Sequence, residues 1–137
     1  MSDFQLHERL QADTTYVTDL PVCRVLLMND ARYPWLILVP RRPGMRDLDE
    51  IDEPESAQVF AEVTMASRVL KSIYDPFKLN VAALGNQVPQ LHIHIIARTE
   101  GDSAWPGPVW GIGDPIAYKT ETQRDTLNAL REAFVTG

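Results

Sequence analysis

Residues 87–98 read QVPQLHIHIIAR and place His92 and His94 among aliphatic side chains. The alternation of polar and branched apolar residues predicts a β-strand over residues 91–98. Successive side chains of a strand point to opposite faces, so both imidazoles project from one face, about 6.5–7 Å apart along the backbone. The aliphatic residues between them face the other way and can be buried against a helix. The sequence therefore predicts a rigid pair of histidines on an otherwise apolar strand.

Two adjacent imidazoles are suited to more than one kind of chemistry. One neutral imidazole can attack an electrophile while its neighbour donates hydrogen bonds to the oxygens of that electrophile. The same spacing also suits Zn or Fe ligation. A third interpretation is two histidines on a polar sheet face with no chemical role. The His-x-His pair by itself leaves these alternatives open.

The segments around the motif predict an antiparallel sheet. Residues 22–29 and 35–40 are nearly continuous apolar runs, separated by a polar connection at residues 30–34 that ends in proline. Such a pattern is typical of a hairpin whose strands are largely buried. Residues 15–18 carry β-forming side chains, and residues 78–84 precede the motif strand as a further strand. We therefore expect about five antiparallel strands.

Helices are predicted at three places. The longest begins near Pro54, because proline suits a first helical turn, and ends at Asp75-Pro76. Its apolar residues recur at spacings of three and four, as expected for an amphipathic helix: Val59, Phe60, Val63, Ala66, Leu70 and Ile73. Shorter helices are expected over residues 4–11 and 120–134. One long helix and two terminal helices on an antiparallel sheet make an α+β fold.

Composition restricts the class of protein. A length of 137 residues suits one compact domain, residues 1–137, and a net charge of −6 argues against a nucleic acid polymer as partner. No apolar stretch approaches the roughly 20 residues needed to cross a bilayer, and residues 1–13 are too polar for a signal peptide. Cys23 is the only cysteine and lies in an apolar run, so we expect a buried thiol in a reducing, cytoplasmic protein.

Residues 87–98 resemble the signature of the histidine-triad (HIT) family, His-φ-His-φ-His-φ-φ with φ apolar, in which an upstream glutamine is often followed by Val-Pro. The resemblance extends to an early hairpin like that of residues 27–39, to the helix that follows it, and to the Trp105-Pro106 pair after the motif strand. It covers about residues 15–110 and leaves a C-terminal loop and helix at residues 111–137. It implies the HIT-like fold, an antiparallel sheet with one long helix packed on it.

The resemblance also implies roles for particular residues. His92 matches the middle histidine, which forms a covalent nucleotidyl-histidine, and His94 matches the third histidine, which contacts the phosphate. Gln87 resembles an upstream residue that hydrogen-bonds the phosphate, and Asn29 resembles a polar residue near the ribose. We further expect Arg98, at the end of the motif strand, at the pocket rim, and Trp105 as a candidate for stacking on a base.

The first triad position departs from the family signature, because it holds Gln90 rather than histidine. Glutamine can hydrogen-bond through its amide, but it cannot titrate near neutral pH or carry a positive charge. A first histidine that only orients the nucleophile could be replaced with modest loss, whereas a charged donor could not. Because His92 and His94 remain, we expect activity, with Gln90 as a third catalytic residue.

The function implied by the resemblance is a nucleotide hydrolase or transferase that acts on the α-phosphate of a purine nucleoside phosphate derivative. Phosphoramidates and dinucleoside polyphosphates both present such a phosphorus. We expect no cofactor or metal, and a homodimer formed through the long helix and the adjacent strand. Two alternatives remain: a nucleotide-binding protein with little turnover, and a metal-binding His-x-His protein.

Overall fold

A five-stranded antiparallel sheet forms the centre of the chain. The computed structural model describes residues 3–136, and its sheet has the order β1-β2-β3-β5-β4. The strands are β1 (Thr14–Asp19), β2 (Cys23–Met28), β3 (Trp35–Pro40), β4 (Lys78–Ala82) and β5 (Ile93–Arg98). The described helices are α1 (Glu8–Asp13), α2 (Glu55–Tyr74), α3 (Thr120–Thr136) and a 3-10 turn η1 (Leu48–Glu50). The α+β prediction with five antiparallel strands and one long helix is confirmed.

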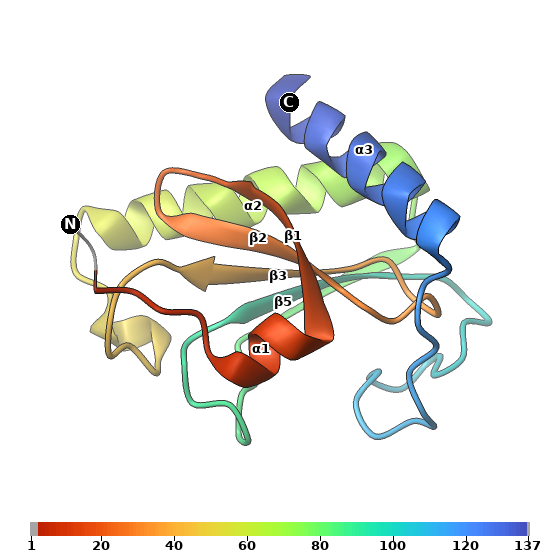
Figure 1. Ribbon diagram of the computed structural model, residues 1–137, viewed down its shortest axis with the longest axis horizontal. Coiled ribbons are helices and arrows are strands. Elements are labelled where there is room, and N and C mark those ends of the chain that lie inside the picture. Colours follow the sequence, from red (N-terminus) through yellow and green to blue (C-terminus); the bar gives the residue numbers. More distant parts are fainter. Residues whose placement is uncertain (1–2, 137) are drawn as a thin grey trace.

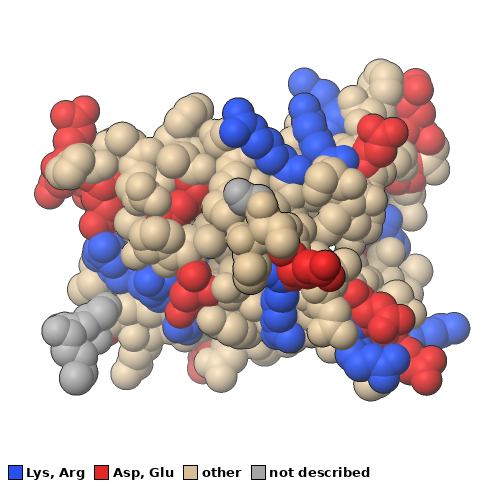
Figure 2. Space-filling model, turned by 90° about the horizontal axis from the view of Figure 1, so that it is seen from above, with Lys and Arg blue, Asp and Glu red and all other residues tan. Residues whose placement is uncertain are grey.

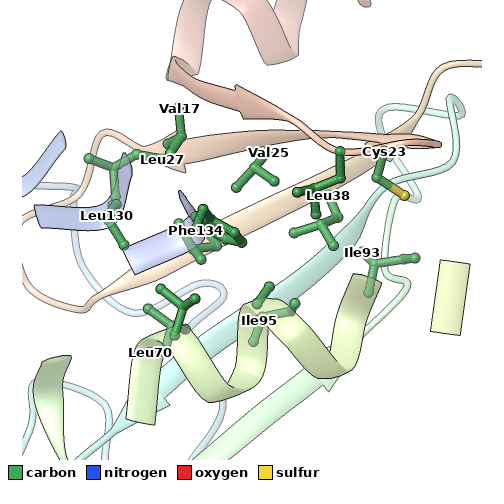
Figure 3. Packing of buried hydrophobic residues seen from close by; sticks show 14 of the residues in the cluster. Val17, Cys23, Val25, Leu27, Leu38, Leu70, Ile93, Ile95, Leu130 and Phe134 are labelled. Carbon is green, nitrogen blue, oxygen red and sulfur yellow. The ribbon is translucent and has the colours of Figure 1, made fainter. Parts of the chain in front are cut away.

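Different helices pack on the two faces of the sheet (Figure 1). Helices α2 and α3 pack on one face, where Ile93 and Ile95 of β5 lie in a buried cluster with Leu70 of α2 (Figure 3). The shorter α1 and the loop before α3 contribute to a second cluster on the other face, around Trp35 and Ile37 of β3. Every residue of β3 and β5 is buried, because each strand is covered on both faces.

The motif strand is shorter than predicted, since β5 begins at Ile93 and His92 lies just before it. Pairing with β4 runs from Lys78↔Arg98 to Ala82↔His94 and stops there. The Leu91 N–H donates to the Met45 carbonyl at 2.9 Å, outside the ladder of the sheet. Residues 83–92 therefore form a loop that carries His92 at its end, and β4 also ends before the predicted residue 84.

The first helix is displaced from the predicted residues 4–11 to Glu8–Asp13. His7 is its N-cap, and the His7 Nδ1 accepts a hydrogen bond from the Arg9 N–H at 3.0 Å. Histidine is not a usual N-cap residue, so the capping preferences of the sequence do not reveal this boundary. Residues 3–7 are not helical, and Gln5 and His7 within them hydrogen-bond the Gln90 side chain of the motif loop.

The remaining helix predictions are confirmed within a few residues. Helix α2 ends at Tyr74 and is C-capped by Asp75, which adopts the left-handed conformation with φ 46°. Helix α3 buries Leu127, Leu130 and Phe134 on one face. Cys23 is fully buried, as predicted. No helix within residues 3–136 is both long and apolar enough to span a membrane. Lys, Arg, Asp and Glu side chains are interspersed on the face seen in Figure 2, with no broad area of one sign.

Candidate active site

A cleft of about 410 Å³ opens beside the two motif histidines. This volume lies within the range of about 300–1,000 Å³ that is typical of small-molecule sites. The cleft is bounded by α1, the start of β3, the loop before β5 and the loop that contains Trp110. Its apolar lining comprises Leu10, Met28, Trp35, Ile37, Leu84, Val88 and Trp110. A largely apolar hollow with two imidazoles at its edge suits a ligand that has both an aromatic and an anionic part.

His92 is held in one tautomer by the main chain. Its Nδ1 lies 2.7 Å from the Gln90 carbonyl oxygen, and a carbonyl can only accept, so Nδ1 carries the proton. In the neutral ring, the lone pair is therefore on Nε2. The side chain is only 6% exposed, and His92 lines the cleft. A carbonyl on the Nδ1 side orients the ring and fixes its tautomer, as is usual for reactive imidazoles.

Gly85 makes room for the His92 ring. A Cβ atom at this position would lie 2.6 Å from His92 Cε1 and 2.6 Å from the Val88 carbonyl oxygen. Real Cβ atoms essentially never come this close, so a larger residue at position 85 must displace either the imidazole or the loop. The loop before β5 therefore contacts the candidate nucleophile directly.

His94 has both ring nitrogens engaged by protein atoms. The Trp35 Nε1–H donates to His94 Nδ1 at 3.1 Å, and His94 Nε2 donates to the Leu84 carbonyl at 2.9 Å. Burial lowers the pKa of His94 to about 4, so this imidazole is neutral at pH 7. As placed, neither nitrogen is available to donate to a phosphate, unlike the role that the family resemblance implies. The ring instead packs edge-on against His92, with centroids 4.9 Å apart.

The Gln90 side chain is directed at the N-terminal segment. Its Oε1 accepts from the His7 N–H and its Nε2 donates to the Gln5 carbonyl, both at 2.9 Å. The residue also lines a smaller cleft of about 190 Å³, which includes Arg46 and shares His92 with the main cleft. Within residues 3–136, the contact between Gln90 and His92 runs through the Gln90 main-chain carbonyl.

Two further predicted residues lie in or near the main cleft. Gln87 is exposed and lines it. Asn29 lines an adjoining hollow of about 480 Å³, which shares Arg9, Asp13 and Trp35 with the main cleft. The Asn29 Oδ1 accepts from the Tyr118 N–H at 2.9 Å, so this side chain also anchors the segment before α3.

Arg98 and Trp105 are not among the residues that line the cleft. Arg98 is 1% exposed and forms a bidentate ion pair with Asp102 at 2.8 and 2.9 Å, and its Nη1 donates to Asn80. The Arg98 hydrogen bonds lower the pKa of Asp102 to about 2. Trp105 packs against Phe77, with ring centroids 5.4 Å apart, and lies beneath the Arg98 guanidinium. These two residues stabilise the turn after β5.

Sequence reasoning missed several residues of the cleft. The sequence marks Trp35 only as part of an apolar strand, yet its indole N–H donates to His94 and its ring packs against Trp110, with ring centroids 6.1 Å apart. Arg9 and Asp13 reach the cleft from α1. The only signal for Gly85 was its position beside the motif, and nothing local marked Arg9. The positions of Gly85 and Arg9 in the site depend on tertiary contacts between segments that are distant in the sequence.

Similarity to known proteins defines the class of this chain. The family model of the HIT domain matches residues 9–101, so the chain belongs to the HIT family. A solved histidine triad protein from Bradyrhizobium japonicum is 50% identical, with a TM-score of 0.93 over 96% of this chain and 98% of that one. A histidine triad protein from Marinobacter aquaeolei is 45% identical, with a TM-score of 0.94 over 97% of each chain.

Curated relatives are more distant. An AP-4-A phosphorylase from Mycobacterium tuberculosis is 32% identical over 81 residues, which are 52% of this chain and 41% of the relative. A bis(5'-adenosyl)-triphosphatase from Saccharomyces cerevisiae is 34% identical over 68 residues, which are 46% of this chain and 33% of the relative. The chain thus matches less than half the length of each of these enzymes.

Proposed function

We propose that the protein is a nucleotidyl hydrolase or transferase that attacks the α-phosphorus of a purine nucleoside phosphate derivative with His92. The observation that carries this proposal is the 2.7 Å contact between His92 Nδ1 and the Gln90 carbonyl, which leaves an Nε2 lone pair on a cleft-lining imidazole. The names of the two curated relatives point to dinucleoside polyphosphates as the first substrates to test.

The reaction has two displacement steps. In the first, the Nε2 lone pair of His92 forms a P–N bond, and the bond from phosphorus to the leaving group breaks, with its electron pair going to the leaving oxygen or nitrogen. The imidazole is now cationic, and the Gln90 carbonyl stabilises the positive charge through the Nδ1–H. In the second step a water oxygen attacks phosphorus and releases a proton to the solvent, the P–N bond breaks, and the nucleoside monophosphate leaves as the electron pair of that bond returns to Nε2.

The cleft offers complementary chemistry for such a ligand. The indoles of Trp35 and Trp110 and the aliphatic side chains beside them suit a purine ring. Gln87 and the main-chain N–H groups of its loop suit the phosphoryl oxygens. Arg9 supplies a cation for further phosphates, and Asn29 in the adjoining hollow suits the ribose side. We assign His94 a positioning role, because its ring supports His92 and its hydrogen bonds fix Trp35 and Leu84.

The test is the release of AMP from diadenosine tetraphosphate and from an adenosine phosphoramidate, each with a metal chelator present. Loss of the nucleophile in His92→Ala should lower turnover by at least about 10³-fold. A radiolabelled α-phosphate should remain on the acid-quenched wild type and be absent from His92→Ala. A matched control is Gln123→Ala: Gln123 lies on α3, and its side chain donates to Thr15 of β1 rather than to a residue of the motif. Equal turnover by His92→Ala and the wild type would refute the mechanism.

Two observations favour a second candidate, a nucleotide-binding protein with little turnover. The first triad position is Gln90, and both His94 nitrogens are engaged. Tight AMP binding without AMP release or trapped label would establish this alternative. For the metal alternative, no cluster of three or more His, Cys, Asp or Glu side chains suited to a metal ion occurs within residues 3–136. Turnover that disappears with the chelator would revive it.

A further inference from the structure

We infer that Gln90 is a positioning residue: its carboxamide ties the N-terminal segment, residues 3–7, to the loop of the nucleophile and thereby holds α1 as a wall of the nucleotide cleft. The inference rests on the proposed function for the identity of the ligand. In this inference Gln90, at the first triad position, positions α1 and does not contact the reacting phosphate. The expected consequence is an effect on nucleotide affinity rather than on the chemical step.

The geometry of the contact suits a carboxamide. Gln90 accepts from the His7 N–H and donates to the Gln5 carbonyl at the same distance, 2.9 Å. These two main-chain groups flank one residue of the segment, so the side-chain amide pairs with them as a residue of a neighbouring strand would. A neutral imidazole also has one donor and one acceptor, but they point in diverging directions. Glutamine can therefore make this paired contact, and histidine cannot.

The contact continues directly into the cleft wall. His7, which Gln90 holds through its N–H, is also the N-cap of α1 and accepts from the Arg9 N–H. The His7 carbonyl accepts from the Gln11 N–H at 3.0 Å. A helix of six residues is too short to be stable alone, so α1 depends on such tertiary contacts. Leu10, which is 4% exposed in the cluster around Trp35, provides the other anchor.

Helix α1 brings charged groups to the cleft. Arg9 and Asp13 both line it, with Arg9 Nε 3.6 Å from Asp13 Oδ2. Among the described residues that line this cleft, Arg9 is the one arginine or lysine. Its position suits a second or third phosphate of the ligand. The tether therefore favours nucleotides with more than one phosphate over nucleoside monophosphates.

Three variants of Gln90 separate this role from a catalytic one. Gln90→Met keeps the length of the side chain and removes both hydrogen bonds, whereas Gln90→Glu keeps the acceptor for the His7 N–H. Because only part of the free energy of the two hydrogen bonds reaches Arg9, their loss corresponds to about a 3–10-fold rise in KM and in the Kd for ADP. We expect this rise in Gln90→Met, a smaller one in Gln90→Glu, and kcat within about twofold in both. Gln90→His should not raise kcat above that of the wild type.

A double-mutant cycle tests the connection to α1. If Gln90 acts by placing Arg9, then Gln90→Met should add less than about twofold to the Kd for ADP in an Arg9→Ala background. Gln123→Met, a matched glutamine substitution on α3, should be additive with Arg9→Ala. Full additivity of Gln90→Met with Arg9→Ala would overturn the inference, as would a rise in kcat in Gln90→His.

Amide hydrogen exchange separates failure of this inference from failure of the proposed function. The His7 amide and the amides of α1 should exchange at least about threefold faster in Gln90→Met than in the wild type, without any ligand. Unchanged exchange would overturn the tether, whatever the enzyme does. A wild type that neither binds nor turns over nucleotides would instead refute the proposed function, and faster exchange in Gln90→Met would still support the tether.

Discussion

The two histidines of the site have different environments although one residue separates them. His92 contacts a carbonyl through Nδ1, whereas His94 is held between the Trp35 indole and the Leu84 carbonyl. Burial lowers the pKa of His94 to about 4, and the hydrogen bond to Leu84 only partly opposes this effect. Within one motif, the surroundings therefore separate a candidate nucleophile from a neutral support.

The buried His94 predicts a pH dependence of stability. Its unfolded pKa is about 6.5, so between pH 6.5 and 4 the unfolded chain binds more protons than the folded chain. Stability should therefore rise with pH across this window and fall as the solution is acidified, by roughly 2–3 kcal/mol in total. Urea unfolding at pH 7 and pH 4.5 measures the difference. The matched His94→Gln variant should lack this part of the pH dependence, and the same slope in both proteins would refute the assignment.

Gly85 predicts a sensitive position beside the nucleophile. Gly85→Ala places a methyl group 2.6 Å from His92 Cε1, so the imidazole or its loop must move. Displacement of a reacting group by about 1 Å can cost about 10²-fold in turnover, and we expect a loss of that order in kcat. Gly107→Ala is the matched control, because its Cβ would meet only the Ala104 carbonyl, at 3.4 Å. Equal kcat in the two variants would contradict the close contact.

At the scale of elements, the buried carboxylate of Glu62 joins α2 to the start of β2. It accepts from the Val22 N–H at 3.0 Å, from the Cys23 N–H at 2.7 Å and from Gln58 Nε2 at 2.7 Å. Glu62 is 2% exposed, so these hydrogen bonds replace the water that the carboxylate loses on folding. The same carboxylate and the burial of the thiol raise the pKa of Cys23, with burial as the larger cause.

Glu62→Gln should destabilise the fold. The amide keeps one acceptor oxygen but places an NH₂ group among donors, so the Val22 N–H loses one of its two contacts with the side chain, at 3.0 and 3.3 Å. We expect a loss of about 1–3 kcal/mol in the free energy of unfolding, measured by urea titration. Glu121→Gln, at an exposed position in the first turn of α3, is the control and should change stability by less than about 0.5 kcal/mol. A loss no larger than that of the control would show that the contact is unimportant.

The sequence predicted those elements whose signals are local. The period of apolar residues predicts α2, and the apolar run predicts β3 with its observed ends. The predicted boundaries of α1 and β5 were wrong because tertiary contacts fix the residues at their starts, through the His7–Gln90 and Leu91–Met45 hydrogen bonds. The motif identified His92, but the partners of Gln90 lie 83 and 85 residues away in the chain. No local pattern reveals such a contact.

At the scale of the whole molecule, the two edges of the sheet are β1 and β4. Beside β1 lies α3, whose Arg131 donates to the carbonyls of Tyr16 and Val17. Strand β4 carries Val81, which is 50% exposed, and is preceded by Phe77, which is 64% exposed. An edge strand with exposed apolar side chains is prone to pair with another chain. This edge is thus where the expected homodimer is best tested.

We predict that the protein is a dimer in solution and that β4 contributes to the contact. Sedimentation equilibrium should give about twice the chain mass of 15.5 kDa. A lysine on an edge strand opposes pairing, so Val81→Lys should shift the equilibrium towards the monomer by at least about tenfold in Kd. Val135→Lys, at an 86% exposed position on α3, adds the same charge elsewhere and should leave the dimer intact. A monomeric wild type would refute the dimer, whereas equal dissociation in both variants would place the contact away from β4.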